Sequence, residues 1–200
     1  GTHLSNGGKT GLDYLKELGV THLQLMPIGD FGTVDEDHPE AYYNWGYDPI
    51  QYSVPEGSYA TDARNPYARV LELKQMIAKL HECGFRVIMD VVYNHMFDRY
   101  KTAFEKIVPS YYFRHGKNGE LSNGSFCGND MATDKIMMRK YIVESCLRWV
   151  EEYGVDGFRF DLMGIIDIET MNQVVEACRK VDENLMFYGE GWNMPTILPD

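Results

Sequence analysis

Basic residues are scarce in this 200-residue chain. Lys and Arg number 19 against 30 Asp and Glu, which gives a formal net charge of −11 at pH 7. Binding to nucleic acid or to an anionic membrane surface depends on basic residues that neutralise phosphates. The charge balance therefore argues against both partners and favours a neutral ligand.

Long hydrophobic runs and paired cysteines are absent too. No apolar stretch approaches the roughly 20 residues that cross a bilayer, and residues 1–4 do not form a basic-then-apolar signal segment. The sequence leaves cytoplasmic and secreted locations open, with a preference for the cytoplasm. The four cysteines lie far apart without a CxxC pair, which predicts reduced thiols rather than a metal site or a disulfide framework. They are Cys83, Cys127, Cys146 and Cys178.

The residues that are present suit one globular domain. Hydrophobic residues make up 44% of the sequence, which is enough for the core of one domain. Aromatic residues make up 13%, and aromatic faces pack well against sugar rings. Most aromatic side chains nevertheless belong to protein cores, so this composition alone does not decide the ligand.

A unit of amphipathic helix, glycine and apolar strand repeats along the chain. Gly19, Gly84 and Gly154 each follow a helical pattern and precede an apolar run. A glycine in this place can adopt the left-handed conformation that ends a helix. The predicted strands cover 22–26, 85–92, 154–162 and 185–188. The predicted helices include one around Leu12, Leu15 and Leu18, one that begins at Asn65-Pro66, one over about 134–152 and one capped by Asp167.

Two segments without regular periodicity, 28–65 and 96–132, predict long functional loops. Strands that alternate with helices predict a parallel sheet joined by right-handed crossovers. The unusual polar residues follow the carboxyl ends of the strands, where barrel enzymes collect their catalytic groups. We therefore expect an α/β fold: a single domain over 1–200 that forms a partial (β/α)8 TIM barrel. It would hold strands 2–5 with flanking helices and be truncated at both ends.

Two carboxylates stand out among these polar residues. Arg159 and Asp161 lie two positions apart on a predicted strand and so point to the same face, where the guanidinium can keep the carboxylate ionised. Glu190 follows the next strand. Carboxylates about 5 to 5.5 Å apart serve retaining glycosidases as nucleophile and general acid. The alternatives are a structural ion pair for Asp161 and an ordinary loop glutamate for Glu190.

Several motifs resemble one enzyme family. The segments 90–95 (DVVYNH), 157–161 (GFRFD) and 189–190 (GE) resemble the first three signature regions of the alpha-amylase family, in order. Segment 43–49 (YNWGYDP), with Tyr52 and residues 55–58 (PEGS), resembles the hallmark of its type I pullulanases. The resemblance implies a debranching glycoside hydrolase that cleaves alpha-1,6-glucosidic linkages in pullulan, starch or glycogen-type alpha-glucans by a retaining double displacement.

The same resemblance implies catalytic roles for three residues. Asp161 would be the nucleophile, Glu190 the acid/base, and Arg159 the group that positions the nucleophile. The family's fourth signature, a His-Asp pair on a later strand, does not occur in these 200 residues. We therefore expect the isolated segment to have little or no activity, and we expect its open sheet edges to promote self-association.

Further residues are expected to contact the substrate. Asp90 and His95 would bind hydroxyls of the sugar that is cleaved, Tyr47 would stack on its ring, and Trp192 would line the acceptor side. We expect Trp45 to pack in the core beneath its loop. No cofactor is required for this chemistry and no metal site is predicted.

Three alternatives remain open at this stage. The barrel could be a non-catalytic carbohydrate-binding or scaffold module, although both carboxylates are retained. It could be a metal-dependent hydrolase that uses His38, Asp90 and His95, although these residues lack the spacing of a metal site. The resemblance is also compatible with a structural calcium near Asn94, which nothing in the sequence requires.

Overall fold

The computed structural model describes residues 2–197, and its centre is a sheet of four parallel strands. The strands are β3 (His22–Leu25), β6 (Arg86–Val91), β7 (Gly157–Phe160) and β8 (Met186–Gly189), and they lie in this order across the sheet. Their order in the chain equals their order in space, as in consecutive strands of a barrel wall. The four predicted strands are confirmed, with differences at their ends.

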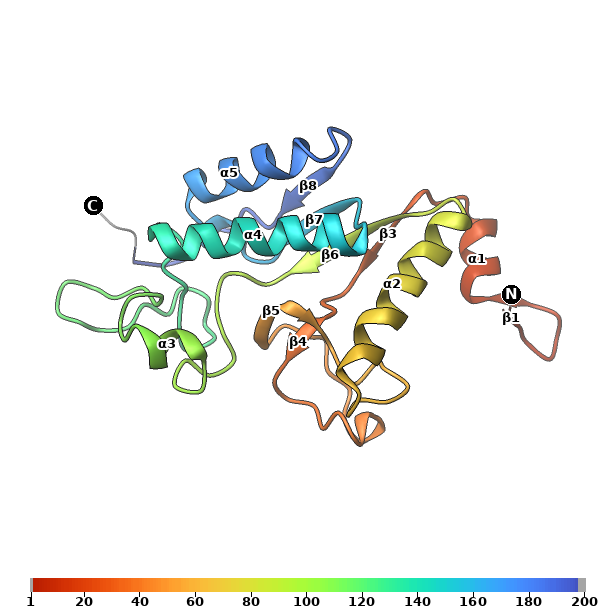
Figure 1. Ribbon diagram of the computed structural model, residues 1–200, viewed down its shortest axis with the longest axis horizontal. Helices are drawn as coiled ribbons and strands as arrows, with labels where there is room; N and C mark the ends of the chain where they lie inside the picture. The colour runs from red at the N-terminus through yellow and green to blue at the C-terminus, as the bar shows by residue number, and fades with distance from the viewer. Residues whose placement is uncertain (1, 198–200) are drawn as a thin grey trace.

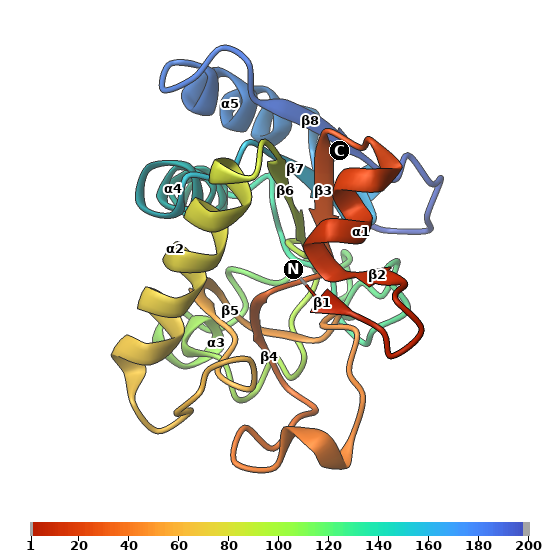
Figure 2. The same ribbon diagram turned by 90° about the vertical axis from the view of Figure 1, so that its right-hand side faces the viewer.

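Helices connect the strands. They are α1 (Gly11–Leu18), α2 (Pro66–Glu82), α4 (Ile136–Tyr153) and α5 (Ile168–Arg179). Figure 2 shows α2, α4 and α5 along one side of the sheet and α1 beside the edge strand β3. The three glycines predicted to end helices, Gly19, Gly84 and Gly154, have φ values of 71°, 88° and 71°, in the left-handed region.

The core lies between the helices and the outer face of the sheet. Because strand side chains alternate between faces, one set of residues points toward the helices and is apolar. The buried members from strands and helices include Val87, Met89, Val91, Phe158, Phe160, Ile77, Met138, Ile142, Trp149 and Val174. The inner face of the same strands carries the polar residues that form the site. The four cysteines are free thiols, as predicted.

The two long connections contain regular structure that the sequence did not predict. In 28–65, β4 (Gly29–Phe31) pairs antiparallel with β5 (Pro49–Pro55), and a 3-10 turn, η1 (Pro39–Ala41), lies between them. In 96–132, α3 (Ala103–Ile107) forms a short helix. Treating these segments as loops without strands or helices was therefore wrong.

Three smaller elements complete the fold. The strands β1 (Thr2–His3) and β2 (Lys9–Thr10) pair near the amino terminus, and η2 (Met163–Ile165) follows β7. Figure 1 shows the two long connections below the sheet. Both contact α4: Trp149 Nε1 donates to the Tyr52 carbonyl at 2.9 Å, and the ring centres of Phe104 and Tyr141 lie 5.0 Å apart. Among the helices of residues 2–197, none combines the length and hydrophobicity of a membrane span.

Candidate active site

Ionisable side chains converge where the parallel strands end. The register aligns Asp90 of β6 with Arg159 of β7, and Arg159 with Tyr188 of β8. Asp161 follows β7 directly, and Glu190 follows β8 directly. The carboxyl ends of neighbouring parallel strands share one rim, so the fold brings these side chains together.

Arg159 contacts three carboxylates at once. Its Nη1 donates to the two oxygens of Asp90 at 2.9 and 3.1 Å and to Oδ1 of Asp161 at 3.0 Å, and its Nη2 pairs with Glu190. Burial acts to lower the pKa of Arg159, but the hydrogen bonds and charges of Asp90 and Asp161 outweigh it and raise the pKa. The guanidinium is therefore a permanent counter-ion, and the contact with Asp161 predicted from the two-residue spacing is present.

Asp161 is held from two sides. Asn94 Nδ2 donates to Oδ2 of Asp161 at 2.8 Å and to its backbone carbonyl at 2.9 Å, while Arg159 holds Oδ1. The next residue, Leu162, has a φ of 41°, which is unusual for a residue with a side chain. Backbone strain of this kind occurs at functional sites, where it aims a group that would otherwise point elsewhere.

Glu190 is fixed by the same strained turn. Leu162 N–H donates to Oε2 of Glu190 at 3.1 Å, and Arg159 pairs with the other oxygen. The carboxylate keeps 31% of its side-chain surface exposed, so a ligand can reach it. A side chain at Gly189 would come within 2.6 Å of the Phe160 carbonyl, which explains why this strand end needs glycine.

Asp90 is enclosed by protein. Its side chain is 0% exposed, and it accepts hydrogen bonds from Arg159, from Tyr47 Oη at 2.9 Å and from Gln24 Nε2 at 3.2 Å. Burial raises the pKa of Asp90, against the lowering effect of the bonds from Arg159 and Tyr47. Each partner of this carboxylate in the described part of the chain is thus another side chain that lines the site.

Tyr47 reaches the site from a tight turn before β5. Gly46 has a φ of 87°, and a side chain there would meet the Pro27 carbonyl at 2.7 Å. The guanidinium of Arg159 lies 5.9 Å from the centre of the Tyr47 ring, within the range of a cation–π contact. Burial, with the hydrogen bond to Asp90, raises the pKa of Tyr47, so its hydroxyl is a permanent donor.

His95 is buried beside Asn94. Its Nδ1 is 2.6 Å from Oδ1 of Asn94, and its backbone carbonyl accepts a bond from Tyr52 Oη at 2.7 Å. Burial lowers the pKa of His95, which favours the neutral ring. The oxygen of Asn94 is thereby engaged, and a calcium ion on Asn94 would have to replace this contact.

The two tryptophans near the site are exposed. Trp192 is 60% exposed and lies shortly after Glu190 in the chain. Trp45 is 62% exposed, so the expectation that it packs in the core was wrong. The buried position in this turn belongs instead to Gly46, because the chain passes too close to Pro27 for a side chain to turn inward there.

Gln24 and Tyr188 belong to the site, although neither is among the predicted site residues. Tyr188 Oη donates to Oε1 of Gln24 at 2.7 Å, and Gln24 donates onward to Asp90. The available signal was weak: a glutamine in the otherwise apolar run Leu23 to Met26. A polar residue in such a run is costly to bury unless it is paired.

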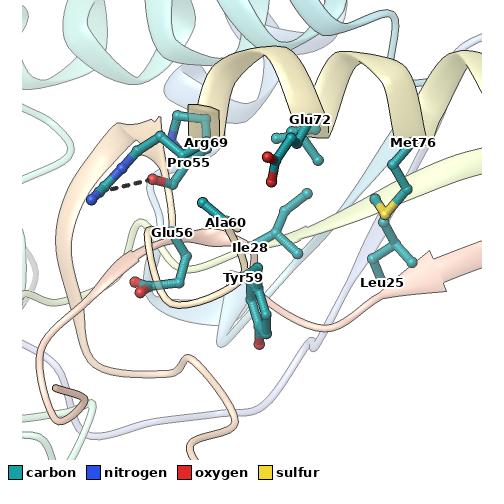
Figure 3. Close-up of a pocket in the computed structure, with 10 residues that line it drawn as sticks. Leu25, Ile28, Pro55, Glu56, Tyr59, Ala60, Arg69, Glu72 and Met76 are labelled. Carbon is teal, nitrogen blue, oxygen red and sulfur yellow. Dashed lines mark hydrogen bonds between the residues drawn. The ribbon is translucent and has the colours of Figure 1, made fainter. Parts of the chain in front are cut away.

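A second group of carboxylates lies on the long 28–65 connection. Asp30, Glu36 and Glu56 have oxygens within 4.8 Å of one another, and Arg69 of α2 pairs with Glu36 and lies 4.0 Å from Asp30. Burial, strengthened by Glu56 and Glu36 and opposed by Arg69, raises the pKa of Asp30 to about 6. Glu56, Tyr59 and Arg69 line a cavity of about 350 Å³, and Figure 3 shows Arg69 bonded to the Pro55 carbonyl at its edge.

The metal-hydrolase alternative gains no geometric support. His38 is exposed and contacts Glu40, whereas Asp90 and His95 are buried with other partners. Within residues 2–197, the carboxylates with the close spacing of metal ligands are instead Asp30, Glu36 and Glu56. Arg69 already supplies a positive charge to that group.

Known proteins are similar to this chain in sequence and in fold. Residues 6–125 match the alpha-amylase family, described as alpha amylase, catalytic domain. The chain is 50% identical over 198 residues to a pullulanase of Bacillus subtilis, covering 99% of this chain and 28% of the relative. It is 36% identical over 238 residues to the chloroplastic pullulanase 1 of Arabidopsis thaliana, covering 98% of this chain and 24% of the relative.

Solved structures agree with the sequence relatives. A crystal structure of a pullulanase from Paenibacillus barengoltzii, in complex with maltohexaose and alpha-cyclodextrin, superposes with a TM-score of 0.97 at 56% identity. The match covers 100% of this chain and 31% of that one. The chain therefore spans less than a third of the length of these relatives.

Proposed function

The chain belongs to the alpha-amylase family, and from this premise we propose that it forms part of the catalytic barrel of a debranching glycoside hydrolase. Residues 1–200 would supply barrel strands 2–5 of a longer protein. The substrate would be a branched alpha-glucan, cut at its alpha-1,6-glucosidic linkages. The third acidic residue of the family would come from a strand outside these 200 residues.

One observation carries this proposal: a single guanidinium joins two carboxylates from neighbouring strands. Arg159 contacts both Asp161, after β7, and Glu190, after β8. When two carboxyl groups lie near one glycosidic bond, one can act as the nucleophile and the other as the proton donor. A purely structural ion pair would need one carboxylate and would not require a strained residue between them.

In the first step, a carboxylate oxygen of Asp161 attacks the anomeric carbon of the sugar. The glycosidic carbon–oxygen bond breaks, and Glu190 gives its proton to the departing oxygen. Arg159 and Asn94 hold Asp161 in position for this attack. Glu190 pairs with Arg159 as a carboxylate, so we propose that it takes up a proton from solvent and turns toward the glycosidic oxygen when a sugar enters.

In the second step, a water molecule releases the sugar. Glu190, now a carboxylate, takes a proton from the water, whose oxygen attacks the anomeric carbon as the bond to Asp161 breaks. Two displacements at the same carbon return it to its original configuration. The net reaction consumes one water molecule and one glycosidic bond, and it uses side chains alone without a cofactor.

The ring of Tyr47 and the imidazole of His95 are proposed to contact the sugar in the cleavage position. An aromatic face packs against the apolar C–H face of a pyranose. Tyr47 is half-buried, with its hydroxyl tied to Asp90, so the ring is held rigidly beside Arg159. Trp192 is exposed and is proposed to line the acceptor side. The sequence predicts that Asp90 contacts the sugar. For this contact, a sugar hydroxyl would have to replace Arg159, Tyr47 or Gln24 as a hydrogen-bond partner of Asp90.

The test is reducing-sugar release from pullulan by the complete protein that contains this chain. Asp161→Asn and Glu190→Gln should each lower kcat by at least about a thousandfold, because each removes a group that reacts with substrate. Glu183→Gln, which alters an exposed carboxylate shortly before β8, should leave the rate unchanged. Maltotriose as the product would identify alpha-1,6 cleavage.

Two outcomes would contradict the proposal. Activity that survives both substitutions would remove Asp161 and Glu190 from the chemistry. Binding of alpha-glucan by the unaltered complete protein, without turnover, would favour the non-catalytic carbohydrate-binding module instead.

A further inference from the structure

A chain of hydrogen bonds crosses the inner face of the sheet and ends on Asp90. Tyr188 Oη donates to Gln24 Oε1 at 2.7 Å, and Gln24 Nε2 donates to Asp90 Oδ2 at 3.2 Å. Tyr188 and Gln24 belong to the edge strands β8 and β3, which β6 and β7 separate.

This link depends on curvature of the sheet. Three steps of about 4.8 Å would place β3 and β8 about 14 Å apart in a flat sheet, and side chains standing upright on such strands would not meet. The 2.7 Å bond between Tyr188 and Gln24 therefore indicates that the sheet is curved, with the inner face concave. The link spans the two middle strands that carry Asp90 and Arg159.

Asp90 has a particular need for such a partner. Its carboxylate is fully enclosed, and a buried carboxylate is stable only when donors surround it. Oδ2 accepts from Gln24, Tyr47 and Arg159, while Oδ1 accepts from Arg159. The Asp90 carboxylate in turn accepts two bonds from Nη1 of Arg159, the same nitrogen that donates to Asp161.

We propose that Gln24 and Tyr188 are positioning residues for catalysis, acting through Asp90 on Arg159 and so on Asp161 and Glu190. Tyr188 fixes the amide of Gln24, and Gln24 fixes one oxygen of Asp90. Neither residue touches substrate in this account. The inference rests on the proposed function, because it assigns roles within the same site.

The alternative is a purely structural link that helps to close the barrel. A structural link would affect stability, and it would affect kcat and KM only as the fraction of folded enzyme falls. A positioning role lowers kcat in fully folded enzyme while KM changes little, because neither Gln24 nor Tyr188 contacts the substrate. The two explanations also differ in how the substitutions combine.

The experiment measures kcat and KM on pullulan with the complete protein, in Gln24→Met, Tyr188→Phe and the double variant. Loss of a bond to a buried charged group should lower kcat about tenfold in Gln24→Met, with KM within about twofold. Tyr188→Phe removes only the hydroxyl and should lower kcat about threefold. The double variant should match Gln24→Met, since Tyr188 acts only through Gln24.

Matched substitutions serve as controls. Tyr67→Phe at the start of α2 and Gln173→Met on α5 alter exposed side chains and should leave kcat unchanged. Thermal unfolding of every variant would establish that the assayed enzyme is folded. Tyr188→Phe keeps its ring and loses one oxygen, so the inference stays testable even if Gln24→Met does not fold.

Wild-type kcat in both single variants would overturn the inference, and so would losses that multiply in the double variant. Asp161→Asn, assayed alongside, separates this failure from that of the proposed function. If Asp161→Asn is inactive while the Gln24 and Tyr188 variants are normal, the inference alone is wrong. If Asp161→Asn is active, the proposed function is wrong.

Discussion

Arg159 is the residue that organises the site. It occupies the middle of the polar inner face and binds one carboxylate on β6, one after β7 and one after β8. Each carboxylate alone would be costly to hold so close to the others. The guanidinium offsets that repulsion and also fixes the geometry, because its donors lie in one plane.

The sequence revealed those residues whose position in a motif is unusual. Asp161 and Glu190 stand out because a carboxylate directly follows a buried strand, and Arg159 because it interrupts an apolar run. Gln24 and Tyr188 stand out less, because a polar residue facing the inside of a curved sheet has the same two-residue spacing as one facing solvent. Only the three-dimensional arrangement distinguishes these cases.

Asp30 should make stability depend on pH. Its pKa is about 6 in the folded protein against an ordinary value of 3.8, so the folded state binds the proton more tightly. The free energy of unfolding should therefore fall by roughly 3 kcal/mol as pH rises from about 4 to about 6, through this residue alone.

Urea unfolding at a series of pH values would check this dependence. In Asp30→Asn the residue no longer charges, so the free-energy difference between variant and wild type should grow in favour of the variant across this interval. The prediction would be wrong if the free energy of unfolding changed with pH in the same way in both proteins, because burial beside Glu36 and Glu56 would then not raise the pKa of Asp30.

At the scale of elements, the sequence predicted the strands and helices of the barrel wall, because each carries a long pattern and a clear end signal. Asn65 caps α2 by accepting from the Tyr67 N–H at 3.0 Å, and Asp167 caps α5, as expected. The pair β4 and β5 was missed. The β4 strand has only 3 residues, and the register shifts on either side of Asp30, so no two-residue alternation survives.

The cap of α5 should be a major contribution to local stability. Asp167 accepts from the Thr170 N–H at 3.0 Å and from the Thr170 hydroxyl at 2.6 Å, and it pairs with Arg139 of α4 at 2.9 Å. Asp167→Ala should lower the free energy of unfolding by about 2 to 3 kcal/mol, since a cap and a partly buried ion pair are both lost.

Asp167→Asn provides the comparison, because asparagine caps helices equally well but carries no charge. It should recover about 1 kcal/mol of the loss in urea unfolding at neutral pH. Burial acts to raise the pKa of Asp167, but the Thr170 and Thr133 bonds and Arg139 lower it, so its stabilisation is present at neutral pH and is lost on acidification. If Asp167→Ala and Asp167→Asn were equally stable, helix capping by residue 167 would not contribute to stability.

At the scale of the whole molecule, the sheet is an open, curved wall. The predicted partial barrel is confirmed by the four parallel strands and by the match to pullulanase structures. The direction of curvature was not readable from the sequence, since it follows from how side chains pack on both faces. The contact between Tyr188 and Gln24 makes it visible.

The 200-residue chain, prepared alone, should self-associate. Within residues 2–197, β3 and β8 have no strand on their outer sides, and apolar inner-face residues such as Met26 and Met186 are about 40% exposed. Exposed strand edges and apolar surface promote pairing between copies. Light scattering during gel filtration should give a mass above that of the monomer.

Met186→Lys places a charge on the inner face of the edge strand β8 and should shift the chain toward the monomer. A matched lysine at Val181, which lies exposed in the connection between α5 and β8, should not. A monodisperse monomer for the unaltered chain at high concentration would contradict this prediction.

The most direct test of the account is to trap the glycosyl-enzyme intermediate. A 5-fluoro-alpha-glycosyl fluoride slows the second displacement more than the first, so the sugar remains on the nucleophile of a retaining enzyme. Treatment of the complete protein, followed by proteolysis and mass spectrometry, should place the label on Asp161, and Asp161→Asn should take up none. A label on another carboxylate, or turnover without any covalent adduct and with inversion of the anomeric carbon, would contradict the assignment of Asp161 as the nucleophile.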